Sequence, residues 1–320
     1  MKIVYAGTPD FAVLPLETIV ASGHEIVAVV TQEDKPQGRK GILTPPPVKT
    51  RALELGIPVL QPAKIRDETE LLRALNAEVM VTCAYGQILT QSVLDCFPKG
   101  VWNIHAGLLP QYRGASPIQS CILAGETTTG VSVMKTELGL DCGDVLLVRS
   151  IKIGETETYG ELSERLSAVG ATLIVEALEQ IALVDKVDEL PLTKQSEEGV
   201  RIVRKITKEQ AKIDFTRSAR EIVALVRAMN PAPVAFTESE GIKINVWRAE
   251  TAEITEEMKE TYALAVCGEV LSDHPKKGLL VKCGDGVVKL TEVQAAGGKR
   301  MGGGDFLNGR KARKGQVFVC

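Results

Sequence analysis

The stretch KIVYAGTPDFAVLPLETIVASGHEIVAVVT, residues 2–31, decides the fold, because two short β-branched runs in it enclose a segment with helical spacing. Similar runs recur as IPVL (57–60), EVMVTCA (78–84) and VWNIH (101–105). Helical segments such as ETELLRALNA (68–77) separate them. The alternation predicts βαβ units and therefore an α/β fold, with a mostly parallel sheet and helices on both faces.

Two further strand-like runs follow this alternation. GVSVMKT (130–136) and VLLVRSIKI (145–153) are joined by a Gly-rich loop that holds Asp141 and Asp144. A helix is expected over about 158–183. These elements extend the first domain, which is predicted to cover residues 1–189.

The remainder of the chain has the character of a second domain. Residues 190–206 are polar, of mixed charge and without clear periodicity, which predicts a linker. Beyond them, short runs such as KINVWRA, GLLVKCG and GVVKLTEVQAAG recur with turn signals between them. This pattern predicts a small, OB-like antiparallel β-barrel over residues 207–320.

Composition limits the class of protein. The 320 residues are 44% hydrophobic and 25% charged, enough for two domains of ordinary size. The seven cysteines are scattered and include no C-x-x-C pair, which speaks against a disulfide framework or a zinc knuckle. Because the chain opens directly into a strand-like run and no apolar run approaches about 20 residues, we expect a cytoplasmic protein with no membrane partner.

Histidine is scarce, so candidates for acid-base chemistry can be weighed one at a time. His24 and His274 lie in turns, where an exposed structural residue is the simpler interpretation. His105 instead closes a predicted strand at the carboxyl end of the sheet, where ligands bind in such folds. Asn103 projects from the same face of this strand. The pair suits a reaction with a tetrahedral oxyanion, although a structural strand end with a capping Asn fits the pattern equally well.

A carboxylate near His105 would strengthen the chemical interpretation. The loop with Asp141 and Asp144 can fold back over the sheet, where a carboxylate would raise the pKa of His105 and make imidazolium available near neutral pH. Rival chemistries have less support. The segment Gly7-Thr8-Pro9-Asp10 is not G-x-G-x-x-G, although a Rossmann-like sheet does not require that motif, and nothing adjacent marks Cys142 as an activated thiol.

With these residues identified, the chain resembles the methionyl-tRNA formyltransferases, a branch of the 10-formyltetrahydrofolate-dependent formyltransferases. The resemblance runs nearly end to end and rests on AGTPDFA, TQEDKPQGRK, TPPPVK, AYGQIL, NIHAGLLPQYRGASPIQ, GLDCGD, NPAP and AGGKRMGGGDFLNG. Two positions depart from the family. Gly107 stands where a serine usually precedes Leu-Leu-Pro, and Ala232 stands where a tryptophan is often found.

The resemblance implies formyl transfer from 10-formyltetrahydrofolate to the α-amino group of methionyl initiator tRNA, by a monomer and without a metal or a covalent enzyme intermediate. By the family's motifs the catalytic residues are Asn103, His105 and Asp141. The folate is expected to lie against Ala84, Tyr85, Gly86, Gln87, Gly107, Leu108, Leu109 and Pro110.

A tRNA partner requires basic surface, because neutralising phosphate dominates such affinity. Basic residues outnumber acidic ones in residues 207–320, whereas acidic residues prevail before them. The resemblance implies that the long loop after the second strand contacts the acceptor stem. The tRNA contacts expected from it and from the basic run at 201–220 are Lys35, Arg39, Lys40, Lys49, Arg204 and Lys205.

Two other functions stay open at this point. The same chemistry could deliver the formyl group to an amino sugar nucleotide, which would need no extended basic surface. The chain could also be a folate- or nucleotide-binding module that senses its ligand without catalysis. Salt-sensitive binding of charged tRNA would distinguish formylation of tRNA from the first alternative. Loss of turnover on replacing His105 would distinguish it from the second.

Overall fold

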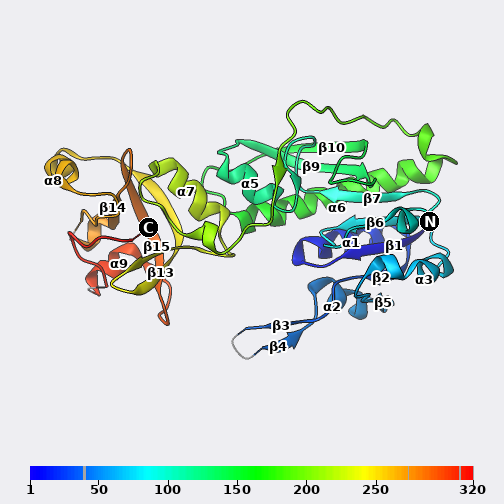
Figure 1. Cartoon of the computed structure of the whole chain (residues 1–320), viewed down its shortest axis with the longest axis horizontal. Helices are drawn as coiled ribbons and strands as arrows, with labels where there is room; N and C mark the ends of the chain where they lie inside the picture. Colours follow the sequence, from blue (N-terminus) through cyan, green and yellow to red (C-terminus); the bar gives the residue numbers. More distant parts are fainter. Residues whose placement is uncertain (39–40, 273, 310, 320) are drawn as a thin grey trace. The chain divides into compact units, whose positions relative to one another are not determined.

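The computed structural model of the protein describes residues 1–38, 41–272, 274–309 and 311–319 (Figure 1). It divides into two compact units. The first, called here the sheet unit, comprises Met1–Pro117, Thr128–Lys152 and Ser163–Arg204. The second, called here the barrel unit, comprises Ile118–Thr127, Ile153–Leu162 and Lys205–Cys320.

The sheet unit is built on seven strands in the order β10-β9-β7-β6-β1-β2-β5. The neighbours from β7 to β5 pair in parallel, whereas β9 pairs antiparallel with β7 and β10. The bounds are β1 Lys2–Gly7, β2 Glu25–Val30, β5 Val59–Leu60, β6 Val79–Cys83, β7 Val101–His105, β9 Thr128–Lys135 and β10 Val145–Lys152. Two small pairs lie outside it, β3 Lys35–Gln37 with β4 Ile42–Thr44, and β8 Arg113–Gly114 with β11 Ile202–Val203. The predicted mostly parallel sheet is thereby confirmed.

Helices pack on both faces of this sheet. On one face Val4 and Met80 share a buried cluster with Leu72 of α3 and Val93 of α4. On the other face the Tyr5 hydroxyl donates to the Ala12 carbonyl, just before α1, at 2.6 Å. The helices from the first part of the chain are α1 Val13–Ala21, α2 Pro47–Glu54, α3 Thr69–Ala74, α4 Gln91–Leu94, α5 Pro117–Leu123 and α6 Tyr159–Leu183.

Among the described residues, α6 is the one helix with the length and apolar composition to cross a membrane, and half of its most apolar stretch is buried within the protein. This is the helix that the sequence predicts over about 158–183. In the sheet unit, its Ser167 hydroxyl donates to the Phe11 carbonyl at 2.8 Å, and Ile174 and Leu178 are fully buried. These contacts are those of a core helix packed on a sheet.

The barrel unit is an antiparallel sheet in the order β12-β13-β15-β14, with β16 on β15. Its C-terminal segment closes the sheet, because Val319 bridges Glu238 of β12, Val317 bridges Glu269, and Val270 bridges Val281 of β14. This closure confirms the predicted small barrel. The bounds are α7 Ala219–Ala228, β12 Ala235–Ser239, β13 Ile242–Ala252, α8 Lys259–Leu264, β14 Leu279–Lys282, β15 Val287–Ala295, β16 Met301–Gly302 and α9 Gly303–Asn308.

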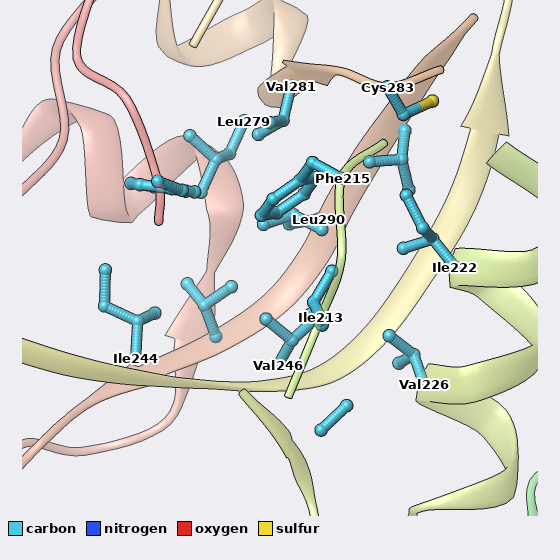
Figure 2. Packing of buried hydrophobic residues seen from close by; sticks show 14 of the residues in the cluster. Ile213, Phe215, Ile222, Val226, Ile244, Val246, Leu279, Val281, Cys283 and Leu290 are labelled. Carbon is cyan, nitrogen blue, oxygen red and sulfur yellow. The ribbon is translucent and has the colours of Figure 1, made fainter. Parts of the chain in front are cut away.

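The barrel has its own hydrophobic core, covered by α7. This helix begins at a capping box in which Ser218 accepts from the Glu221 amide and the Glu221 side chain accepts from the Ser218 amide. Figure 2 shows Ile222 and Val226 of α7 directed toward Phe215 and the inner side chains of the strands. An independent core of this kind is what a separately folding unit requires.

Candidate active site

Asn103 and His105 occupy the carboxyl end of β7, in the interior of the sheet. Asn103 pairs in register with Thr82 of β6 and Met134 of β9, and His105 pairs with Ser132 of β9. The intervening Ile104 is buried on the opposite face, where it lies against Gly170 of α6. The alternation therefore fixes both polar side chains on one face of a strand held from both sides.

Thr82 determines which way the Asn103 amide points. Its hydroxyl donates to Oδ1 of Asn103 at 2.9 Å, from the register-matched position on β6. The carbonyl end of the amide is therefore engaged inside the protein, and Nδ2, which can only donate, is turned the other way. A donor oriented in advance is what stabilisation of an oxyanion requires. Thr82 was not among the residues predicted from the sequence, although its register with Asn103 in the predicted sheet points to it.

Replacing Thr82 by valine is expected to lower kcat about 10-fold, because the Asn103 amide then loses the partner that fixes its donor; a full loss of one oxyanion donor costs about 10²- to 10³-fold. Steady-state transfer kinetics give the measurement. Thr31→Val is the matched control, since the Thr31 hydroxyl, directly after β2, is buried with no hydrogen-bond partner in the part of the chain that the structure describes. Equal kcat values for both variants would argue against the orienting role.

His105 is held between two partners from different loops. Its Nε2 lies 3.1 Å from the Tyr112 carbonyl, and its Nδ1 lies 3.6 Å from Oδ2 of Asp141. Because a carbonyl only accepts, Nε2 carries the hydrogen and Nδ1 presents a lone pair in the neutral ring. A proton arriving at Nδ1 would be shared with the carboxylate. His105 is thus placed to accept a proton at Nδ1.

The protonation expected from the sequence is wrong in direction. Burial lowers the pKa of His105 below its usual value, and the charge of Asp141 and the Tyr112 carbonyl oppose this effect without reversing it. His105 is only 4% exposed, so losing hydration outweighs the nearby carboxylate. The imidazole is therefore neutral near pH 7, whereas the sequence analysis expected imidazolium.

Asp141 reaches His105 because its loop, residues 136–144 between β9 and β10, turns back over the sheet. Its backbone is left-handed, with φ of 47°, and its Oδ2 accepts from the Gly114 amide at 2.8 Å. Gly143 makes the turn possible, since a Cβ there would lie 1.9 Å from the Lys135 carbonyl oxygen. Asp144 accepts the Lys135 amide through its backbone carbonyl at 2.9 Å. Of the two acidic residues, the structure brings Asp141 to the imidazole.

The first expected folate segment, residues 84–87, offers mainly backbone. The Tyr85 ring is buried and its carbonyl accepts from Thr8 at 2.9 Å. The Gln87 side chain accepts from the Ile65 amide at 2.8 Å and donates to the Pro62 carbonyl at 3.0 Å. The Gln87 side chain is therefore occupied within the protein, and the Tyr85 ring is enclosed. Ala84 and Gly86 are exposed with left-handed backbone.

The second expected folate segment, residues 107–110, is fixed by a residue that the sequence analysis missed. The Ser132 hydroxyl donates to the Gly107 carbonyl at 2.8 Å and accepts from the Leu109 amide at 3.2 Å. Gly107 lies beside the imidazole, because a Cβ there would lie 3.0 Å from Nε2 of His105. The absence of a side chain at Gly107 leaves room for the ring edge. Leu108, Leu109 and Pro110 are partly exposed.

The residues expected to contact tRNA have varied surroundings. Lys35 lies in β3, and Arg204 and Lys205 are exposed. Lys49 forms an ion pair with Asp34 at 2.8 Å. Arg39 and Lys40 lie outside the described residues.

A Rossmann-like sheet with Asn103, His105 and Asp141 at one end, joined to a small barrel, defines a group-transfer enzyme. Family models described as "Formyl transferase" and "Formyl transferase, C-terminal domain" match residues 1–178 and 205–311. The chain belongs to the formyl transferase family.

Relatives named methionyl-tRNA formyltransferase match the chain almost end to end. That of Neisseria meningitidis serogroup B is 44% identical over 318 residues, which cover 98% of this chain and 99% of the relative. That of Chromohalobacter salexigens is 45% identical over 318 residues, with 98% and 95% covered. The crystal structure of an N-formyltransferase from Helicobacter canadensis with folinic acid and dTDP-3-aminofucose has a TM-score of 0.64 at 17% identity, covering 90% of this chain and 98% of that one, which shows a shared fold.

Proposed function

We propose that the protein transfers the formyl group of 10-formyltetrahydrofolate to the α-amino group of methionyl initiator tRNA, the modification used in translation initiation. The observation that carries this proposal is the identity of 44% and 45% to methionyl-tRNA formyltransferases over nearly the whole of both chains. The site supports it, since an oriented amide donor and a proton acceptor are the groups that direct formyl transfer needs.

In the proposed mechanism the methionyl amine attacks the formyl carbon. A carbon–nitrogen bond forms, the carbonyl becomes an oxyanion, and Asn103 Nδ2 donates to it. The amine nitrogen then loses a proton to Nδ1 of His105, and Asp141 stabilises the resulting imidazolium. Collapse of the intermediate breaks the bond to N10 of the folate, which takes up that proton. The reaction is balanced without an added acid, base or metal.

An amino sugar nucleotide is the alternative acceptor, because the Helicobacter protein shares the fold and its structure contains such a sugar. The exposed cations favour tRNA. Lys35, Arg204 and Lys205 are exposed side chains that can meet phosphate, and a compact sugar nucleotide has no use for cations spread along the chain. We further propose that the enzyme acts as a cytoplasmic monomer, which light scattering tests directly.

The proposal is tested by assaying formyl transfer to charged initiator tRNA at several salt concentrations. The KM for tRNA is expected to rise about 10-fold or more between about 50 and 200 mM salt, because phosphate contacts release counterions. The KM for 10-formyltetrahydrofolate is the internal control and should change little. A variant with both Arg204 and Lys205 replaced by alanine should flatten the salt dependence. Salt-independent tRNA kinetics, or transfer to dTDP-3-aminofucose alone, would favour the sugar acceptor.

A further inference from the structure

Gln195 contacts the loop that carries Asp141 from a distant part of the sequence. Its Nε2 donates to the Asp141 carbonyl at 2.9 Å and to the Gly143 carbonyl at 2.7 Å. Its Oε1 accepts from Nε of Arg113 at 3.0 Å. The side-chain amide of Gln195 therefore joins the loop 136–144, which carries Asp141, to Arg113 in the segment that follows β7.

Arg113 sets the orientation of this amide. Arg113 is only 7% exposed, and a buried guanidinium requires an acceptor. Because Nε of Arg113 can only donate, it takes the Oε1 end of Gln195 and leaves Nε2 facing the two loop carbonyls. The loop receives two donors on its far side, while Oδ2 of Asp141 accepts from the Gly114 amide on the near side.

The segment 195–204 also contacts Tyr112 and its neighbours, and the Tyr112 carbonyl is the other partner of His105. Its β11 pairs in parallel with β8, at Ile202 with Arg113 and at Val203 with Gly114. Gly114 permits this close pairing, since a Cβ there would lie 2.2 Å from the Val203 carbonyl oxygen. Arg201 donates to the Tyr112 hydroxyl at 2.9 Å. Tyr112, whose carbonyl meets Nε2 of His105, has left-handed backbone with φ of 57°.

We propose that Gln195 is a positioning residue for catalysis, which holds the Asp141 backbone so that the carboxylate faces Nδ1 of His105. The inference rests on the proposed formyl transfer but not on the identity of the acceptor. Left-handed backbone at a non-glycine residue persists only where surrounding contacts fix it, and Gln195 supplies one such contact at Asp141 and a second two residues further along the loop, at Gly143. Loss of those contacts moves the carboxylate and leaves substrate binding in place.

The test compares Gln195→Glu with the wild type and with Lys194→Ala, an exposed neighbour that serves as control. Glutamate keeps the acceptor for Arg113, so the variant should fold, but it has no donor for the Asp141 and Gly143 carbonyls. We expect kcat to fall about 10- to 100-fold, with little change in the KM of tRNA or folate, since misplacement by about 1 Å costs on this order. Gln195→Met, of similar size, removes all three bonds and replaces the glutamate variant if that fails to fold.

A double-mutant cycle with Asp141→Asn separates positioning from a general structural effect. If Gln195 acts through Asp141, Gln195→Glu should add little further loss in the Asp141→Asn background. An equal fold-loss in both backgrounds, or a wild-type kcat for Gln195→Glu, would overturn the inference. The cycle is run on whichever acceptor the wild type formylates, charged tRNA or dTDP-3-aminofucose. A wild type active only on the sugar overturns the proposed acceptor and leaves the test of Gln195 intact.

Discussion

Replacing His105 by alanine is expected to lower kcat for formyl transfer by about 10²- to 10⁴-fold, the contribution of a positioned proton acceptor. The imidazole is buried with Nε2 on the Tyr112 carbonyl and the lone pair of Nδ1 facing Asp141, so its loss removes the proposed proton acceptor from the site. Binding of tetrahydrofolate should remain, because the expected folate segments at 84–87 and 107–110 have their own supports. Turnover is measured under saturating substrates and folate binding by equilibrium titration.

His24→Ala is the matched control for this experiment. His24 directly precedes β2, at the amino end of a parallel strand, whereas His105 closes β7 at the opposite, carboxyl end. The same substitution there should leave kcat near the wild-type value. Undiminished turnover in His105→Ala would contradict the catalytic role of His105 and favour a module that binds folate without catalysis. A loss of folate binding with it would show that the ring supports the folate segments.

Much of the fold follows from local pattern. The runs at 2–6, 78–84 and 101–105 became β1, β6 and β7, because interior parallel strands are buried on both faces and read as β-branched runs. The helix expected at about 158–183 is α6, Tyr159–Leu183. A strand ending at His105 also placed Asn103 on the same face, since side chains alternate strictly along a strand.

The pKa of His105 could not be predicted from local pattern. The sequence shows that a carboxylate can come near, but whether its attraction outweighs burial depends on how fully the ring is enclosed. The loops that carry Tyr112 and Asp141 determine that enclosure together. Desolvation acts on the charged form regardless of which neighbours cause it, and here it exceeds the attraction of Asp141.

The role of Gln195 could not be predicted from the sequence for a different physical reason. Residues 190–204 belong to the sheet unit, where they are held by a two-residue strand pair, a backbone bridge between Thr193 and Val145, and a few side-chain bonds to loops. Such contacts leave no periodic pattern, so the segment predicted only a linker. The Gln87 side chain shows the converse, because a motif drew attention to a residue whose side chain is occupied in holding the backbone at Ile65 and Pro62.

Asp141→Asn is expected to reduce kcat by about 10²- to 10⁴-fold while keeping the loop in place. The amide oxygen can still accept from the Gly114 amide, which now binds Oδ2, so the geometry is retained and the charge alone is lost. Without that charge the imidazolium formed when the amine gives up its proton has no counter-ion in a buried site. Asp144→Asn is the matched control, because it removes one negative charge from the same loop.

The pH profile of kcat/KM gives a second reading of the same variant, and its direction follows from the sign of each effect. Burial lowers the pKa of His105 and Asp141 raises it, so the wild-type acid limb should lie below pH 6.5, where protonation removes the acceptor. In Asp141→Asn the raising effect is gone, the neutral ring persists to lower pH, and the limb should move further toward acid. A limb that stays in place, or that moves equally in Asp144→Asn, would show that Asp141 does not set the protonation of His105. The two readings report different properties, since kcat falls when the imidazolium loses its counter-ion, whereas the acid limb moves only if the charge of Asp141 sets the pKa of His105.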